Sequence, residues 1–156
     1  MIISSKKRAG MSLVEVVISS AIVLLISMAF ISINLLYLKT SDTSIKTVKA
    51  TYLIEEGVEA VNFLKDKDWA GLGVVGVNYY LVWIGTTWQA TTTKSYIDQV
   101  FERKYSFENV NRDSNMNITL VGGTVDLNTR KLTVQVSWSD ISGTTTKSMS
   151  SYLMKP

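Results

Sequence analysis

The sequence contains no cysteine and no histidine, and its single proline is Pro156. Without cysteine, no disulfide can staple the fold and no thiolate can bind a metal. Without histidine, the chain lacks the usual zinc ligand and the usual general base. No proline interrupts a helix ahead of residue 156. These absences exclude the commonest metal and acid–base sites, and the length leaves room for one membrane segment and one small globular domain.

The charge is unevenly distributed along the chain. Lys and Arg number 16 against 13 Asp and Glu, and the basic excess lies entirely in Lys6, Lys7 and Arg8. Basic residues immediately before an apolar run act as a positive-inside topology signal. We therefore expect residues 1–10 in the cytoplasm and the remainder of the chain outside.

A long apolar run follows, from Met11 to Leu38, and Glu15 is its only charge. About 28 residues in a helix span roughly 42 Å, enough to cross a bilayer with some tilt. A charge inside such a segment costs about 2.5 kcal/mol or more, so an acid there indicates a functional site that needs a partner. Residues 11–38 are predicted to be the transmembrane half of a helix.

Residues 39–68 change to an amphipathic helical pattern. Two apolar stripes face opposite sides: Ile45, Val48 and Tyr52 form one, and Ile54, Val58 and Val61 form the other. One interpretation is a helix held between its own domain and a neighbouring subunit. The alternative is a kink at Gly57 that lets one chain bury both stripes.

Residues 69–156 are predicted to form an antiparallel β domain. Leu132, Val134, Val136 and Trp138 alternate with polar residues, and residues 145–154 are typical of a returning strand. We expect another strand at residues 101–108, a separate strand at Val125 and Leu127 joined through Asn128-Thr129, and, within an aromatic-rich connection over residues 71–93, one short strand near 78–84. The expected fold class is α+β, a long N-terminal helix packed on a small antiparallel sheet.

The segment Lys6-Lys7-Arg8-Ala9-Gly10-Met11-Ser12-Leu13-Val14-Glu15 resembles the class III signal of the type IV pilin superfamily. In that family a basic leader ends in Gly, and an acid stands fifth in the mature chain. The specific resemblance covers residues 6–38, although the family usually has Phe where this chain has Met11. An ordinary secretory signal has small residues at a cleavage site after the apolar run, and Leu36-Tyr37-Leu38-Lys39 lacks that pattern.

The resemblance implies a processing and assembly route. A prepilin peptidase would remove residues 1–10 by cutting between Gly10 and Met11, and Met11 would be N-methylated. Glu15 would pair with the N-terminal amine of a neighbouring subunit during assembly. The implied partners are this peptidase, like or related subunits, an inner-membrane assembly platform and the lipid bilayer. The implied protein is a minor pilin or pseudopilin of a type IV pilus or a type II secretion filament.

Other classes remain open on the sequence alone. There is no nucleophile–base pair or phosphate loop, so we predict no enzyme and no cofactor. Asp113 to Asn117 resembles half a calcium loop, but Ile118 stands where Gly is needed, which favours a polar turn. The slight basic excess of residues 94–156 leaves a DNA-contacting tip subunit as a less favoured alternative. A plain single-pass anchor carrying a β domain is the remaining one.

Overall fold

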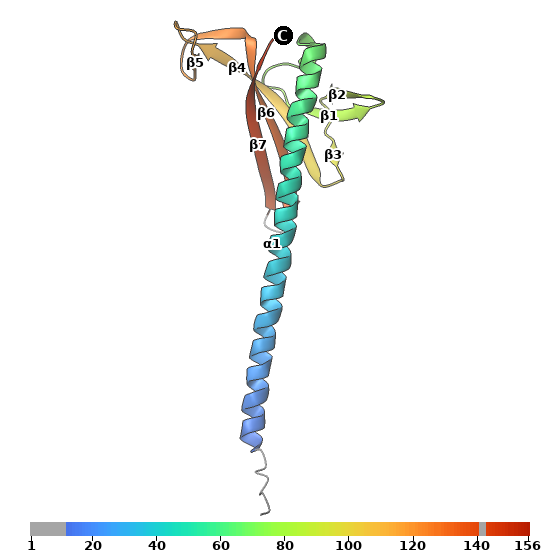
Figure 1. The fold of residues 1–156 in the computed structure, drawn as a ribbon, viewed down its shortest axis with the longest axis vertical. Helices are drawn as coiled ribbons and strands as arrows, with labels where there is room; N and C mark the ends of the chain where they lie inside the picture. Colours follow the sequence, from blue (N-terminus) through green and yellow to red (C-terminus); the bar gives the residue numbers. More distant parts are fainter. Residues whose placement is uncertain (1–11, 141–142) are drawn as a thin grey trace, which may run out of the picture. The chain divides into compact units, whose positions relative to one another are not determined.

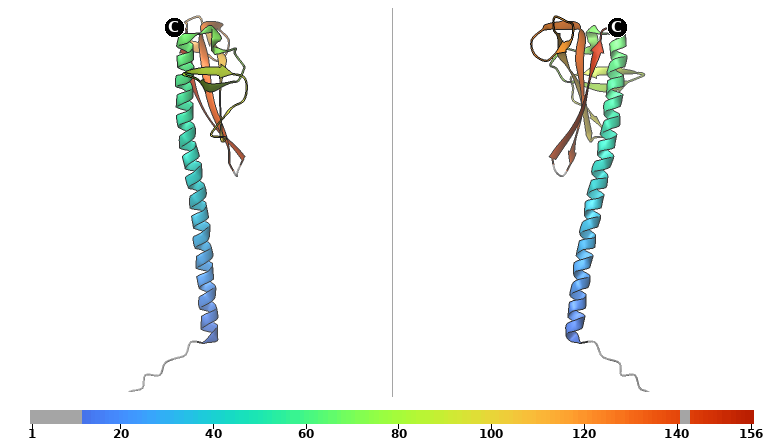
Figure 2. Two further views of the ribbon diagram at one scale, coloured as in Figure 1. Left: turned by 90° about the vertical axis from the view of Figure 1, so that its right-hand side faces the viewer. Right: turned by 60° about the vertical axis from the view of Figure 1, so that its left-hand side comes forward.

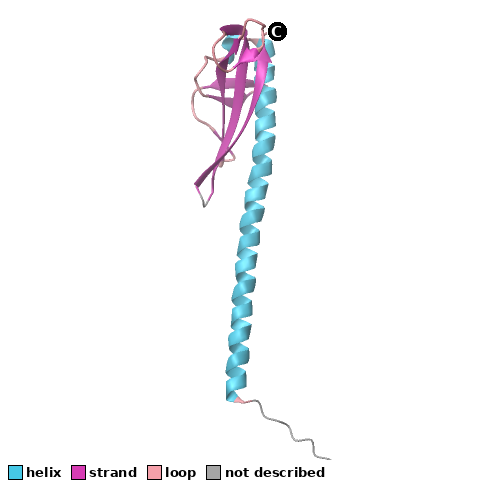
Figure 3. Cartoon of the chain, turned by 90° about the vertical axis from the view of Figure 1, so that its left-hand side faces the viewer, coloured by secondary structure: helices cyan, strands magenta, loops and turns pink. Residues whose placement is uncertain are grey.

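The computed structural model describes residues 12–140 and 143–156. One long helix precedes an antiparallel sheet, so the predicted α+β fold class is confirmed (Figure 1; Figure 3). The elements are α1 (Leu13–Lys67), the short 3-10 helix η1 (Ala70–Leu72), β1 (Tyr79–Ile84), β2 (Thr87–Thr91), β3 (Tyr96–Ile97), β4 (Phe101–Arg112), β5 (Ile118–Thr119), β6 (Thr124–Asp140) and β7 (Gly143–Met154).

The chain divides into two compact units. The first ends at Thr43, and the second, Ser44–Pro156, is called the folded unit below. Helix α1 passes through both units without an interruption in its helical assignment. In the first unit, α1 is long and apolar enough to cross a membrane, and none of its most apolar 18-residue window is buried. This stretch is the candidate single membrane span of the protein.

The sheet of the folded unit has the strand order β2-β1-β4-β6-β7, and the short strands β3 and β5 also pair with β4. Every pairing is antiparallel. Strands β4, β6 and β7 are the long members. In β4 and β6 the alternation of buried and less buried residues places one face toward α1 and the other toward solvent, whereas β7 is largely exposed. The predicted returning strand at residues 145–154 is confirmed as β7, which begins two residues earlier.

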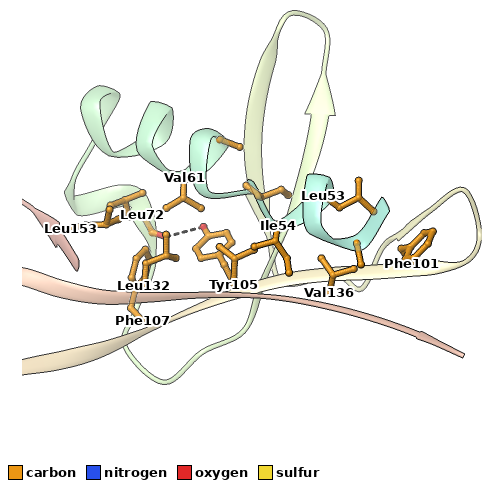
Figure 4. Close-up of a cluster of buried hydrophobic side chains, with 14 of the residues drawn as sticks. Leu53, Ile54, Val61, Leu72, Phe101, Tyr105, Phe107, Leu132, Val136 and Leu153 are labelled. Carbon is orange, nitrogen blue, oxygen red and sulfur yellow. Dashed lines mark hydrogen bonds between the residues drawn. The ribbon is translucent and has the colours of Figure 1, made fainter. Parts of the chain in front are cut away.

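The core lies between the last turns of α1 and the centre of the sheet (Figure 4). Ile54 and Val61 of α1 pack there with Leu132, Val134 and Val136 of β6. The hydroxyl of Tyr105, itself fully buried, donates a hydrogen bond to the carbonyl of Leu72 at 3.0 Å. This bond satisfies the one polar atom that the tyrosine brings into an otherwise apolar cluster.

Two predictions about the strands are wrong. Residues 128–129 do not join separate strands, because β6 runs unbroken from Thr124 to Asp140. Its pairing with β4 jumps from Arg130 to Asp126 between Asn109 and Val110, so the chain bulges at residues 127–129 instead of turning. The connection over residues 71–93 also holds a second strand, β2, which forms a hairpin with β1.

Candidate functional site

Glu15 lies in the first turn of α1 and is exposed. The carbonyl of Ser12 accepts the backbone N–H groups of Glu15 at 2.9 Å and Val16 at 3.2 Å, which closes the first turn. Among the described residues, no hydrogen bond or ion pair involves the Glu15 carboxylate. The carboxylate is therefore available to a partner outside the part of the chain that the structure describes.

Four other polar side chains of this apolar stretch are satisfied within the helix. Ser27, Ser32 and Asn34 donate to the carbonyls four residues before them, at 2.8 to 3.0 Å, and Ser20 donates to Val17 at 2.9 Å. Such internal bonds let hydroxyl and amide groups enter lipid at a modest cost. Glu15 differs from them, because an ionised carboxylate has no donor of its own in this helix.

The remaining predicted site residues lie outside the described residues. They are the basic residues Lys6, Lys7 and Arg8 and the two residues of the expected cleavage site, Gly10 and Met11. Their roles as topology signal, cleavage site and methylation site stay predictions.

A second candidate surface is the apolar stripe of α1 in the folded unit. Ile45, Val48 and Tyr52 are 64%, 55% and 67% exposed, whereas Ile54 and Val61 of the opposite stripe are buried in the core. The first three residues, with Ser44 and Lys49 of the same helix, line a shallow depression that is open to solvent. We call it the helix groove. The kink alternative is wrong, because the single chain buries only one of the two stripes.

Gly57 has a packing role at the helix–sheet contact. A Cβ atom at this position would lie 2.9 Å from Cγ1 of Val134 and 3.2 Å from Cδ of Arg103. Only glycine therefore lets α1 approach the sheet this closely, and this contact fixes which face of the helix is left outward.

Arg103 is the one charged side chain buried in this contact among the described residues. It is 4% exposed, donates to the carbonyl of Leu53 at 3.1 Å, and pairs with the half-exposed Glu56 at 3.3 Å. Its guanidinium lies 5.2 Å from the ring centre of Trp88. Burial lowers the pKa of Arg103, and Glu56 opposes that shift without cancelling it. The residue therefore links α1 to the sheet and is not available to an outside ligand.

Asp113 forms a polar turn, the interpretation that the sequence favours. Its Oδ1 accepts the backbone N–H groups of Asn115 at 2.8 Å and Asn117 at 2.9 Å, and these bonds lower its pKa. Within residues 12–140 and 143–156, no three acidic side chains are grouped as a metal site would require. The carboxylate is already used by its own loop, so this turn carries no calcium proposal.

The sequence-based predictions missed one surface, the connection between β5 and β6, which crosses from one edge of β4 to the other. Leu120 and Val121 are 92% and 87% exposed there, and Met116 and Leu127, on either side of this connection in the sequence, are also exposed. The available signal was the absence of any charge from Ser114 to Val125. The sequence of that stretch is typical of a strand and a turn. Alternation predicts which face of the sheet a residue lies on, but it does not predict whether another element covers that face.

Comparisons of the chain with protein-family models, with curated proteins and with solved structures find no match. The functional conclusion is therefore carried by the residues and geometry of the chain itself.

Proposed function

We propose that this chain is a structural subunit of the type IV pilin superfamily, a minor pilin or pseudopilin, and not a catalyst. The observation that carries the proposal is the single carboxylate of Glu15, at the first turn of a helix that is otherwise uncharged and exposed as far as Leu38. A plain anchor has no use for a charge that costs about 2.5 kcal/mol or more to insert. A subunit that must pair with another subunit's α-amine, in contrast, needs this charge.

The proposed life of the chain has three stages. It is inserted with residues 1–10 in the cytoplasm and the folded unit outside. A prepilin peptidase cuts between Gly10 and Met11, which creates an α-amine at the start of the membrane helix, and that amine is methylated. An assembly platform in the inner membrane then moves the subunit into a filament, where Glu15 pairs with the amine of a neighbour.

The unbroken helix supports this proposal. Helix α1 runs from Leu13 to Lys67, so an apolar stretch and the element that anchors the sheet are one piece of secondary structure. A filament built on such helices keeps them in its interior and places the sheets outside. The exposed helix groove is the kind of surface that a neighbouring subunit would cover.

The described contacts do not favour nucleic acid as the partner. Lys94 pairs with Glu102 at 2.7 Å, Arg112 with Asp126 at 2.7 Å, and Lys131 with Glu108 at 3.1 Å. Arg103 is buried. Four of the eight basic side chains of residues 94–156 are thus paired with acids or buried, so a DNA-contacting tip subunit remains the less supported alternative.

The test is mass spectrometry of the N-terminal peptide, from protein made with and without a prepilin peptidase. The expected result is a chain that begins at Met11, carrying an N-methyl group, only when the peptidase is present. An intact leader in both samples, or a cut beyond Leu38, would leave a plain anchor or a secreted β domain and would remove the role of Glu15.

A further inference from the structure

Strand β7 forms one margin of the sheet, and among the described residues only β6 pairs with it. It lies alongside the part of α1 that belongs to the folded unit (Figure 1; Figure 2). The pairing with β6 continues from Gly143 to Met154 without a register shift. The 12 residues of β7 extend over about 40 Å, so the strand presents a long, regular edge on its other side.

The register identifies the backbone groups that point outward from this edge. In an antiparallel pair, alternate residues direct their N–H and C=O groups to the partner strand, and the residues between them direct theirs away. The N–H of Lys155 donates to the carbonyl of Asn128 at 2.8 Å, so the odd-numbered residues of β7 face β6. The outward backbone groups belong to residues with uncharged side chains, which are Thr144, Thr146, Ser148, Ser150, Tyr152 and Met154. Among the described residues these groups have no hydrogen-bond partner.

This edge lacks the features by which most sheets discourage the addition of a strand. Natural edges are kept short, bulged, charged or interrupted by proline. The opposite margin, β2, is short, with 5 residues. Strand β7 has 12 residues, no proline and a single charge, Lys147, whose ammonium donates to the hydroxyl of Thr51 on α1 at 2.7 Å. The edge therefore fits an extended polypeptide, which can pair with its donors and acceptors in turn.

The α1 side of this edge is acidic. Thr51, which accepts the hydrogen bond from Lys147, is followed one and two turns later by Glu55 and Glu59. Both acids are exposed, and among the described residues neither carboxylate takes part in a hydrogen bond or an ion pair. Unpaired acids beside a row of backbone donors and acceptors favour a strand that carries cations.

The spacing of the two acids matches the repeat of a strand. They are separated by a rise of about 6 Å along the helix, and alternate residues of a strand, which share a face, are about 6.8 Å apart. Strand β7 and this part of α1 run in the same direction, because Lys147 lies at Thr51 and Leu153 packs at the Val61 end of the core (Figure 4). A strand added to β7 would thus place two side chains, two positions apart, along the two acids.

We propose that the free edge of β7 binds an extended segment of another protein. This segment adds a strand to the sheet and presents two basic side chains, two positions apart, to Glu55 and Glu59. A second copy of this chain fits less well, because its β7 offers only one cation, Lys147, which already donates to Thr51. The inference does not rest on the proposed function. It uses neither Glu15 nor the processing of the leader, so either proposal can fail without the other.

The test uses the full chain in a non-ionic detergent and a synthetic peptide as the probe. The peptide is a short strand of alternating valine and threonine in which two lysines stand two positions apart, and the fluorescence anisotropy of an attached dye measures its binding. In one control peptide glutamates replace the lysines, and in the other N-methyl groups block the backbone N–H groups. We expect each control peptide to bind about tenfold or more weakly than the lysine peptide, because one loses the charge match and the other loses the backbone bonds.

Matched variants of the chain separate the edge from non-specific attraction. Ser148→Pro removes one outward N–H and leaves every bond to β6 in place, whereas Ser148→Thr keeps that N–H and serves as the control. We expect only the proline variant to lose binding of the lysine peptide, with unchanged circular dichroism. Glu55→Lys combined with Glu59→Lys should reverse the preference, so that the glutamate peptide binds better than the lysine peptide. The charge reversal leaves β7 unchanged, so it tests the proposal even if Ser148→Pro does not fold.

Hydrogen exchange followed residue by residue by NMR detects the added strand directly. In the chain alone the outward amides, such as that of Ser148, should exchange rapidly, and the bound lysine peptide should slow them about tenfold or more while the odd-numbered amides of β7 stay as they are. Equal affinities for the three peptides, or binding without this alternate pattern, would overturn the proposal. Outward amides that are protected without peptide, to a degree that rises with the concentration of the chain, would show that a second copy occupies the edge and would overturn it as well.

Discussion

At the scale of the residue, Glu15 differs from other polar side chains of its helix because its carboxylate has no hydrogen-bond partner there among the described residues. Ser20, Ser27, Ser32 and Asn34 all donate to carbonyls of their own helix. A carboxylate has no donor and must find one elsewhere, from water, a lipid headgroup or another chain. In lipid the first of these is scarce, which makes the acid dependent on a partner in a way that the neighbouring hydroxyls are not.

Replacing that acid should separate processing from assembly. We expect Glu15→Ala to be cut at Met11 as the parent is, because the expected cleavage site lies four residues earlier. Its level in sheared filaments should fall roughly tenfold or more, since the lost pairing involves a charge whose insertion costs about 2.5 kcal/mol. The measurement is the ratio of the subunit in filament and membrane fractions. The control is Ser19→Ala, one turn further along the same face, which should leave the ratio unchanged; a normal ratio for Glu15→Ala would contradict the assembly role.

Arg103 is the second residue whose charge does not suit its environment, because the side chain is buried. Its Nε has no hydrogen-bond partner among the described residues, and its only acid, Glu56, is half-exposed. A buried charge with incomplete partners is often no better than an apolar side chain of the same volume. Its stem, by contrast, fills space against Gly57, where a truncated side chain would leave a void.

Two substitutions therefore distinguish packing from charge at this position. We expect Arg103→Ala to lower the free energy of unfolding by about 3 kcal/mol through the void it leaves. Arg103→Met, of similar length, should stay within about 1 kcal/mol of the parent. Urea unfolding of the full chain in detergent, followed by tryptophan fluorescence, measures both. If Met costs as much as Ala, the ion pair with Glu56 and not the stem carries the stability.

At the scale of the element, α1 is defined by a close approach in its last turns. Gly57 removes a side chain at the crossing, and Val134 of β6 occupies the space. This contact leaves Ile45, Val48 and Tyr52 facing outward on the opposite side. A helix pressed this tightly on its sheet keeps its second stripe available for a neighbour.

Adding one methyl group at that crossing should be unfavourable in spite of helix propensity. Alanine is better than glycine in a helix by about 1 kcal/mol, whereas overpacking a tight core costs about 1–3 kcal/mol. We expect Gly57→Ala to lower the free energy of unfolding by about 1 kcal/mol. The same change in a Val134→Ala background, where Cγ1 is absent, should become neutral or stabilising. Stabilisation in both backgrounds would mean that the crossing has room to spare.

The elements differ in how far the sequence determines them. The alternation of Leu132, Val134, Val136 and Trp138 predicts the centre of β6 correctly, because all four are covered by α1 and have to be apolar. The same alternation at Val125 and Leu127 suggests core, yet Leu127 is largely exposed. Here the sheet extends past the helix. The alternation of apolar and polar residues does not show at which residue α1 stops covering the sheet.

Strand β2 and the partner of Arg103 escape prediction for a different reason. Trp83 and Trp88 face each other across the β1–β2 hairpin with ring centres 5.1 Å apart, a contact that exists only once the strands pair. Arg103 interrupts an apolar alternation in the sequence, and only the structure supplies the carbonyl of Leu53 and the ring of Trp88. Glu15, in contrast, is identifiable from sequence, because a lone charge in a long apolar run needs no tertiary context to be noticed.

At the scale of the whole molecule, the proposed function depends on which side of the membrane each end of the chain occupies. Lys6, Lys7 and Arg8 are the only cations ahead of the apolar run, and beyond them the chain is formally neutral. Cationic residues are retained on the cytoplasmic side during insertion, and a neutral unit is free to cross. A filament that grows outward needs this orientation, since the opposite one would place the folded unit in the cytoplasm.

The orientation can be read by labelling, again because the chain has no cysteine. In peptidase-free cells, which are expected to keep the leader, Ser148→Cys should react with a membrane-impermeant maleimide. Ser5→Cys should react only after the membrane is opened with detergent. The contrast should be close to all-or-none, because the reagent does not cross the bilayer, and labelling after detergent shows that both cysteines are reactive. Labelling of Ser5→Cys in intact cells would show that the topology is reversed, and the folded unit could then not take part in an extracytoplasmic filament.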